Sequence, residues 1–470
     1  MKNEGIKNRI SRETGGTIGF LAGCLALVAG LSFAQIRASR PMLVIVMGAF
    51  LAFLIPGVKR KLSLPILLFF LPWSPLMKMR PGSISFFTVG LIAVCVLHFI
   101  SGGAELSLRD YILTAVIAAL TLIAKMLQGN QIAVYYVKFI FMLLLFPAVA
   151  KGAYGTVSFR DMTVFFAMGI ISAALTAKQV SGFTNISAYI KVDSYLTITR
   201  LSGFYGDPNF YSAHITACMA AIQLLLPIER SRMGRTFMAA VFVLLTYCGL
   251  LSASKAFAVI VIALFIFWIP VLLERRNRSG ALVRIVVTII GVFIVALSLT
   301  SVRELLRVFD DRFRYAYNIS RLTTHRTELW QVYFEKLAED PVLALFGEGY
   351  TTVNINGWAS HNSLIQSVYQ FGLLGLPAVI IWLHGLIVST FADNTLTRPR
   401  IKETMLMIVG VIMPWMSLDI LFFDEFFLLP VFVSIGLADS AASKRQYADL
   451  RPLNWGSGSF DVRKKRISVE

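Results

Sequence analysis

The stretch TIGFLAGCLALVAGLSFA, from Thr17 to Ala34, decides the fold class because it contains no charged side chain along its whole length. An α-helix of about 20 apolar residues spans the hydrocarbon core of a bilayer. A second apolar run begins near Pro41, so more membrane-like sequence follows the first run. We therefore predict a retained first transmembrane helix and not a cleaved signal peptide.

The rest of the chain repeats this pattern. Of its 470 residues, 57% are hydrophobic and 15% are charged, whereas soluble globular domains have about 25% charged residues. The composition excludes soluble, disordered and disulfide-scaffold proteins, and predicts an all-α polytopic integral membrane protein with about 12–14 transmembrane helices. The predicted spans begin near Thr17, Pro41, Leu62, Ser83, Tyr111, Gln131, Asp161, Asn209, Thr236, Lys255, Arg284, Ser363, Thr404 and Leu421. The third span could instead be re-entrant, because it contains the helix-breaking residues Pro65, Pro72 and Pro75.

The formal net charge of +18 follows from this topology. If the N-terminus faces the cytoplasm, most lysines and arginines of the short loops fall on the cytoplasmic side, as the positive-inside rule requires. Lys59-Arg60-Lys61 is one such cluster. We predict a membrane domain over residues 1–443, a basic cytoplasmic tail over residues 444–470, and both termini in the cytoplasm. Nucleic acid is not an expected partner, because the basic residues follow the membrane topology.

Two outward segments, residues 178–207 and 301–361, are too long to be simple turns, and such loops are usually functional or disordered. In the second, apolar residues recur at helical spacing from Glu328 until Pro341, and Gly347 then permits a tight turn. We predict a large structured extracytoplasmic loop whose amphipathic helix rests on the helix bundle or on the membrane interface. Its apolar positions are Leu329, Trp330, Tyr333, Phe334 and Leu337, opposite Gln331, Glu335, Lys336 and Glu339.

Several catalytic classes lack their motifs. The inward loops are short, and the chain contains no GxxxxGKS or GxxxxGKT phosphate loop, no HExxH and no other metal-ligand spacing. Any chemistry is therefore expected at the outward loops and helix ends, without a metal or a cofactor. The cysteines form no CxxC pair and lie inside apolar runs, where cysteine behaves as a small hydrophobic residue: Cys24, Cys95, Cys218 and Cys248.

Two basic side chains mark outward helix ends. His361 begins a helix where the long loop returns to the membrane, and an imidazole with a pKa near ~6.5 can accept a proton at neutral pH. The structural alternative is a helix-end histidine that bonds to the backbone or to Asn362. Lys255 lies in a short outward turn, where it could bind an anion or simply extend to the membrane interface.

Three further polar residues have both a structural and a functional interpretation. Arg326 precedes the amphipathic helix, where it could pair with Glu328 or Asp311. Asp207 is expected to cap the N-terminus of the helix after it. His214 lies one turn further along that helix and is a weaker candidate for the outer end.

The order of several short motifs is more specific than any one of them. They are Gly206-Asp207-Pro208-Asn209 at a helix start, Ser254-Lys255, Arg326-x-x-x-Trp330, Pro341 with Gly347-x-Gly349, and His361-Asn362-x-Leu364 followed by Gly372 and Gly375. In this order and topology they resemble the O-antigen polymerase/ligase family of bacterial membrane glycosyltransferases. The resemblance covers residues 200–375, and before that only the hydrophobicity is similar. Members commonly carry Ser-Arg where this chain has Ser254-Lys255, which replaces a bidentate guanidinium with a point charge.

The resemblance implies a glycosyltransferase C-like fold in the bacterial cytoplasmic membrane. Such enzymes transfer an oligosaccharide from a polyprenyl-diphosphate carrier to an acceptor at the outer face, with inversion and without a metal. Fixed cations would stabilise the charge that develops on the diphosphate, the role that Mg²⁺ has elsewhere. The implied roles are catalytic base for His361, diphosphate binding for Arg326, Lys255 and Arg200, and acceptor or sugar contacts for Asp207 and Asn362.

The family's known partners extend these expectations. They are the lipid-linked glycan donor, a glycan or lipid acceptor, the bilayer, and chain-length regulator and flippase proteins. The residues do not separate a polymerase of repeat units from a ligase of finished glycan, and we favour the polymerase because two outward loops could hold two lipid-linked substrates. A flippase or transporter is disfavoured because the polar groups gather at one face and only Lys138 lies well inside a span. A purely structural scaffold leaves the folded outward loop unexplained.

Overall fold

The computed structural model describes residues 2–80, 83–101, 106–130, 134–153, 157–187, 190, 194–195, 198–229, 231–275, 325–350, 355, 359–388, 401–418 and 428–449, with the isolated residues 307, 310, 313 and 314. Within these ranges, eight helices are long and apolar enough to cross a membrane. They belong to α1 (Lys2–Ile36), α2 (Arg40–Lys59), α5 (Leu108–Leu127), α6 (Val134–Ala153), α7 (Phe159–Val180), α10 (Arg232–Leu251), α11 (Lys255–Arg275) and α17 (Ser363–Val388). The prediction of a helical, polytopic membrane protein is confirmed.

Shorter elements occupy the remaining described positions. Five of the predicted spans are helices that are shorter or less apolar than those eight: α3 (Ser63–Phe70) with the 3₁₀ helix η1 (Leu71–Leu76), α4 (Phe86–Ile100), α9 (Pro208–Leu225), α18 (Ile401–Val411) with the 3₁₀ helix η3 (Met413–Ser417), and α19 (Leu428–Asp449). The predicted span near Arg284, residues 315–324 of the long loop and the tail beyond Asp449 lie outside the described residues. The 178–207 segment holds α8 (Thr184–Ser187) and a small antiparallel hairpin of β1 (Ser194–Tyr195) and β2 (Ile198–Thr199).

The third predicted span is a buried helix of the bundle interior. Every side chain of α3 is buried, and a Cβ on Gly169 of α7 would collide with the backbone of Phe69. The helix tightens into η1 at Pro72 because proline cannot donate to an α-helical hydrogen bond. At about 1.5 Å per α-helical and 2 Å per 3₁₀ residue, the pair is roughly 24 Å long. Its contacts are with protein on all sides, so it needs no lipid-facing length.

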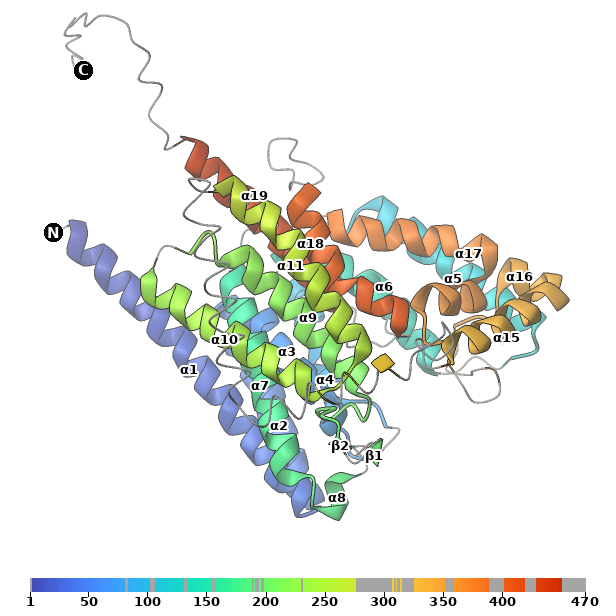
Figure 1. The fold of residues 1–470 in the computed structure, drawn as a ribbon, viewed down its shortest axis with the longest axis horizontal. Helices are drawn as coiled ribbons and strands as arrows, with labels where there is room; N and C mark the ends of the chain where they lie inside the picture. Colours follow the sequence, from blue (N-terminus) through green and yellow to red (C-terminus); the bar gives the residue numbers. More distant parts are fainter. Residues whose placement is uncertain are drawn as a thin grey trace, which may run out of the picture.

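Helix α9 forms the centre of the molecule. It contacts α7, α10, α11, α18 and α19, and almost all of its side chains are buried. In Figure 1, α1 and α2 lie on one side of it, and α5, α15 (Arg326–Glu339), α16 (Pro341–Phe346) and α17 lie on the other. The two halves are therefore joined through α9 and the helices around it.

The helices alternate in direction, so their connections gather at two ends of the bundle. We call one the Arg200 end; there Gln35 at the end of α1 donates to the carbonyl oxygens of Leu76 and Lys78, at 2.7 and 3.2 Å. At the opposite Asp110 end, Lys151 forms a 2.6 Å ion pair with Asp110. The first turn of α1 and the last turn of α19 both lie towards the Asp110 end (Figure 1).

Candidate functional site

The turn between α10 and α11 carries the first group of predicted site residues. Arg200 Nε donates to the carbonyl oxygen of Ser252 at 3.0 Å, and the next residue, Leu201, donates its backbone N–H to Leu251 at 2.9 Å. Lys255, the first residue of α11, is half-buried three positions beyond Ser252. The structure therefore brings Arg200 and the Ser254-Lys255 motif to one place, although more than fifty positions separate them in sequence.

The start of α9 joins the same group. Asp207 Oδ1 accepts from the backbone N–H of Asn209 at 2.7 Å, so Asp207 caps α9 as predicted. Asn209 Oδ1 in turn accepts from Ser254 Oγ at 2.7 Å. The Gly206-Asp207-Pro208-Asn209 and Ser254-Lys255 motifs are thus directly bonded. His214 lies deeper in α9 and is fully buried beside Phe166 and Tyr205, away from the surface position that we considered for it.

The His361-Asn362 motif begins α17. Asn362 is 5% exposed, and its Oδ1 accepts from the backbone N–H groups of Leu364 and Ile365 at 3.0 and 3.3 Å. Asn362 therefore caps the N-terminus of α17. His361 is half-buried beside it and has a left-handed backbone with φ of 51°.

Arg326 begins α15, and its Nη1 donates to the carbonyl oxygen of Ser417 at the end of η3. The hydroxyl of Ser363, two residues after His361, donates to the carbonyl oxygen of Leu418. Consecutive carbonyl groups thus hold Arg326 and the first turn of α17 next to each other. Glu328, one of the two partners considered for Arg326, accepts from His325 at 3.1 Å, and the other, Asp311, lies outside the described residues.

The 3₁₀ helix η3 connects the two groups. It contacts α9 and α11, which carry Asp207 and Lys255, and it contacts α17, which follows His361. The sequence did not predict this element, because Met413–Ser417 is apolar and continued the expected span from Thr404. Pro414 was the one signal of a break in that helix.

Unusual backbone conformations accompany these residues. Among the described non-glycine residues, positive φ occurs at Ala38, Lys61, Ala253, His325 and His361. Three of them lie at the candidate site. Ala253 precedes Ser254-Lys255, His325 precedes Arg326, and His361 is itself a candidate residue. Left-handed conformations of non-glycine residues cost about 1–3 kcal/mol and cluster at functional sites. The surrounding contacts therefore hold these side chains in place at the cost of local backbone strain.

The amphipathic helix of the long loop is present as α15. Its Tyr333 and Leu337 are buried against α16 and α17 in a cluster with Leu343, Ile365 and Tyr369. The indole N–H of Trp330 donates to the carbonyl oxygen of Ser360 at 2.8 Å. The predicted polar face, including Gln331 and Glu335, is exposed, whereas Phe334 departs from the predicted buried stripe and is 54% exposed.

A glycine contact fixes α16 to α17. Gly347 (φ 78°, ψ −176°) and Gly372 (φ 61°, ψ −178°) touch through their backbones. Glu348 and Gly349 donate their N–H groups to the carbonyl oxygens of Tyr369 and Gln370, at 2.9 and 3.0 Å. Gly372 also interrupts the helical conformation of α17. The tight turn predicted at Gly347 and Gly349 is therefore a docking point for α15 and α16.

A charged group beneath this docking point escaped the sequence analysis. Lys125, in the last turn of α5, is 4% exposed and has the Glu348 carboxylate as its charged neighbour. Glu348 also accepts from Asn130 Nδ2 at 2.7 Å. More than two hundred positions separate Lys125 from Glu348, so no local pattern could pair them.

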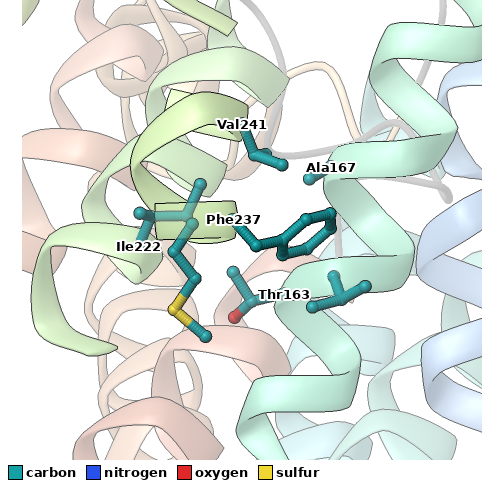
Figure 2. Close-up of a pocket in the computed structure, with 7 residues that line it drawn as sticks. Thr163, Ala167, Ile222, Phe237 and Val241 are labelled. Atoms are coloured by element: carbon teal, nitrogen blue, oxygen red, sulfur yellow. The ribbon is translucent and has the colours of Figure 1, made fainter. Parts of the chain in front are cut away.

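The structure also has an apolar pocket that lies apart from these candidate residues. It lies between α7, α9 and α10 towards the Asp110 end and is lined by Thr163, Val164, Ala167, Ile222, Phe237, Met238 and Val241 (Figure 2). The one hydroxyl there, of Thr163, donates to Phe159 within its own helix. Over the described ranges, no three His, Cys, Asp or Glu side chains gather into a metal-binding group.

The site is thus a polar cluster at the Arg200 end of a polytopic membrane protein. Arg200 and Lys255 adjoin the turn between α10 and α11, and the carbonyl groups of residues 417 and 418 hold Arg326 and the start of α17, which follows His361. The element η3 contacts both α11 and α17. Comparison with known proteins assigns no family: no protein-family model matches the chain, and no curated protein sequence matches it.

Proposed function

We propose that this chain is a membrane glycosyltransferase that polymerises polyprenyl-diphosphate-linked oligosaccharide repeat units into cell-surface polysaccharide. In this proposal it lies in the bacterial cytoplasmic membrane with both termini in the cytoplasm. The Arg200 end faces the outer side. The proposal also places the chain in the O-antigen polymerase/ligase family, on the motifs between residues 200 and 375.

One observation supports the proposal above the others. Arg200, Lys255, Arg326 and His361 come from four distant parts of the chain. Arg200 is bonded to Ser252, three residues before Lys255, Arg326 is bonded to Ser417 of η3, and η3 contacts both α11, which begins with Lys255, and α17, which follows His361. A cluster of fixed cations suits a diphosphate, because each ionic hydrogen bond to phosphate is stronger than a neutral one. An adjacent imidazole suits proton removal near neutral pH.

The reaction follows from this arrangement. The acceptor hydroxyl oxygen attacks the anomeric carbon from the face opposite the diphosphate and forms the new glycosidic bond. The bond from that carbon to the diphosphate oxygen breaks, and the polyprenyl diphosphate leaves with the electron pair. His361 takes the hydroxyl proton, and Arg326, Lys255 and Arg200 stabilise the negative charge that develops on the leaving group. Inversion at the anomeric carbon results from the opposite-face attack.

The buried charges bear on the transporter alternative. Besides the half-buried Lys138, the described bundle buries two charged side chains, Lys125 and Glu403, which are 4% and 2% exposed, and the two imidazoles of His98 and His214. Lys125 lies in the last turn of α5 and Glu403 in the first turn of α18. Both are at helix ends, whereas carriers place their ionisable groups near the middle of the bilayer. Enzymatic transfer at the Arg200 end remains the better-supported function.

Reconstitution tests the proposal. Purified protein in proteoliposomes receives lipid-linked repeat units extracted from source cells that lack this gene, and either a second lipid-linked unit or a lipid acceptor. We expect a ladder of longer glycans on a gel with the first acceptor, and the same ladder with a metal chelator present. Finished glycan on the lipid acceptor alone would indicate a ligase. Movement of lipid-linked glycan across the bilayer without any transfer would indicate a transporter and refute the proposal.

A further inference from the structure

We infer that the indole N–H of Trp415 in η3 donates a hydrogen bond to the diphosphate of the lipid-linked substrate. This inference rests on the proposed function, and it adds a neutral donor to the charged groups. Trp415 belongs to the element that joins the two groups of candidate residues. Its contribution would therefore come from the centre of the site.

The indole N–H of Trp415 is buried without an acceptor. The side chain is 4% exposed, and no described residue accepts a hydrogen bond from its Nε1. A buried donor left unpaired loses its hydration without gaining a hydrogen bond in return. Such a group calls for an explanation, and an absent ligand that completes the hydrogen bond is one.

The other described tryptophans set the contrast. Trp73, Trp268, Trp330 and Trp382 each donate the indole N–H to an oxygen atom, at 2.8–3.2 Å. Pairing is therefore the rule among the other described indoles, including that of Trp330 at the candidate site. Trp415 departs from it in the element where a substrate is expected.

The carbonyl oxygens in and beside η3 accept from donors other than the indole N–H. Ser417 accepts from Arg326, Leu418 from Ser363, and Pro414 from the hydroxyl of Ser417 at 3.0 Å. Ile412 accepts the backbone N–H of Trp415 itself. Each of these oxygens could accept a second hydrogen bond, yet among the described residues none receives the indole N–H.

The chemistry of that acceptor follows from its surroundings. An indole only donates, so its partner must be an acceptor. A diphosphate has only acceptor oxygens, and the basic residues of the candidate site, of which Arg326 is bonded to η3, favour an anion. A neutral sugar hydroxyl would gain little from those cations. The phosphate oxygen is therefore the acceptor to which the observations point.

A shape-preserving replacement tests this inference. β-(3-Benzothienyl)alanine has sulfur in place of the indole N–H, and amber suppression can introduce it at position 415 of the full-length chain. Two quantities are measured in the reconstituted system: kcat/KM for lipid-linked repeat units, and the inhibition constant of added undecaprenyl diphosphate. Hydrogen bonds to charged groups are worth about 1.5–3 kcal/mol. We therefore expect kcat/KM to fall roughly 10- to 100-fold and the inhibition constant to rise by a similar factor.

Trp382 supplies the matched control. It is 2% exposed, and its N–H donates to the carbonyl oxygen of Leu143 at 2.9 Å, within the bundle. The same replacement there should lower the thermal midpoint of the substrate-free protein and leave kcat/KM unchanged. At position 415 the substrate-free midpoint should not fall, because no hydrogen bond is lost.

The outcomes separate the two proposals. A wild-type protein that extends no lipid-linked glycan would refute the proposed function, and with it this inference. An active wild type with an equally active position-415 variant would overturn the inference alone. A position-415 variant whose substrate-free midpoint falls as much as that of the position-382 variant would show a structural partner for the N–H, and would also overturn it.

Discussion

Replacing Gly347 with alanine should release α15 and α16 from α17 and thereby inactivate the site. The backbone of Gly347 has φ of 78° and ψ of −176°, a region that is essentially reserved for glycine, and a non-glycine residue there costs about 1–3 kcal/mol. A Cβ would lie 2.5 Å from the carbonyl carbon and oxygen of Gln370. Ordinary contacts between such atoms are about 3.5–4 Å, so one backbone must move by about 1 Å. Overpacking of this kind adds about 1–3 kcal/mol, for a combined cost of roughly 2–6 kcal/mol.

The cost falls on the docking of α16, because the opposing atoms belong to α17. Arg326 lies at the start of the neighbouring helix α15, so we expect its contact with Ser417 to loosen together with the docking. Hydrogen–deuterium exchange should therefore rise across α15 and α16, while the spans on the far side of α9 keep their protection. Chain extension in the reconstituted assay should fall with it.

Gly129 provides the control for this prediction. It has a similar positive φ of 68°, but a Cβ there meets nothing within 4 Å. Gly129→Ala therefore carries only backbone strain of about 1–2 kcal/mol, in a turn at the same end of the bundle. If Gly347→Ala changes exchange and activity no more than Gly129→Ala does, the contact between α16 and α17 does not position the site and the reasoning is wrong.

Four substitutions at the site have distinct expected outcomes. His361→Ala should abolish chain extension at normal protein level, whereas His384→Ala, on an exposed face of the same helix, should not; a normal ladder from His361→Ala would refute its role as base. Arg326→Ala should reduce activity severely and Arg326→Lys only in part, since lysine keeps the charge but loses the planar fork; equal activity of the two variants would contradict this. Lys255→Arg should retain chain extension, seen as a ladder of glycans on a gel, because the positive charge persists. Complete loss of the ladder would mean that position 255 acts through packing and not through its charge. Asp207→Ala should lower the free energy of unfolding by about 1 kcal/mol through loss of the α9 cap, and Asp207→Asn by less, as measured by denaturant titration.

The long apolar runs were sufficient to predict the eight spanning helices, because lipid contact requires both length and uninterrupted hydrophobicity. They could not separate α3 or α9 from spans, because a helix surrounded by other helices is equally apolar without the same length. The 24 Å or so of α3 and η1 illustrates this. Proline positions carried the remaining information: Pro72 marks the change to η1, and Pro414 the start of η3.

The predicted site residues met for a topological reason. Alternating spans place every second connection at one end, so Arg200, Lys255, Arg326 and His361 share the Arg200 end. Their detailed bonding did not follow from the sequence. The Asn362 oxygen caps α17, Arg326 bonds to a backbone carbonyl of η3, and Lys125 faces Glu348. Each of these pairs depends on how helices pack, and residues far apart in sequence give no local signal of it.

The position of η3 has a consequence for biogenesis. The carbonyl groups that hold Arg326 and Ser363 belong to residues 417 and 418, which the ribosome delivers after every candidate side chain. A chain truncated before residue 401 would carry the imidazole and all three cations but would lack the carbonyl groups that hold Arg326 and the start of α17. The candidate site would therefore be completed late in membrane insertion, after α18 and η3 have packed against α9.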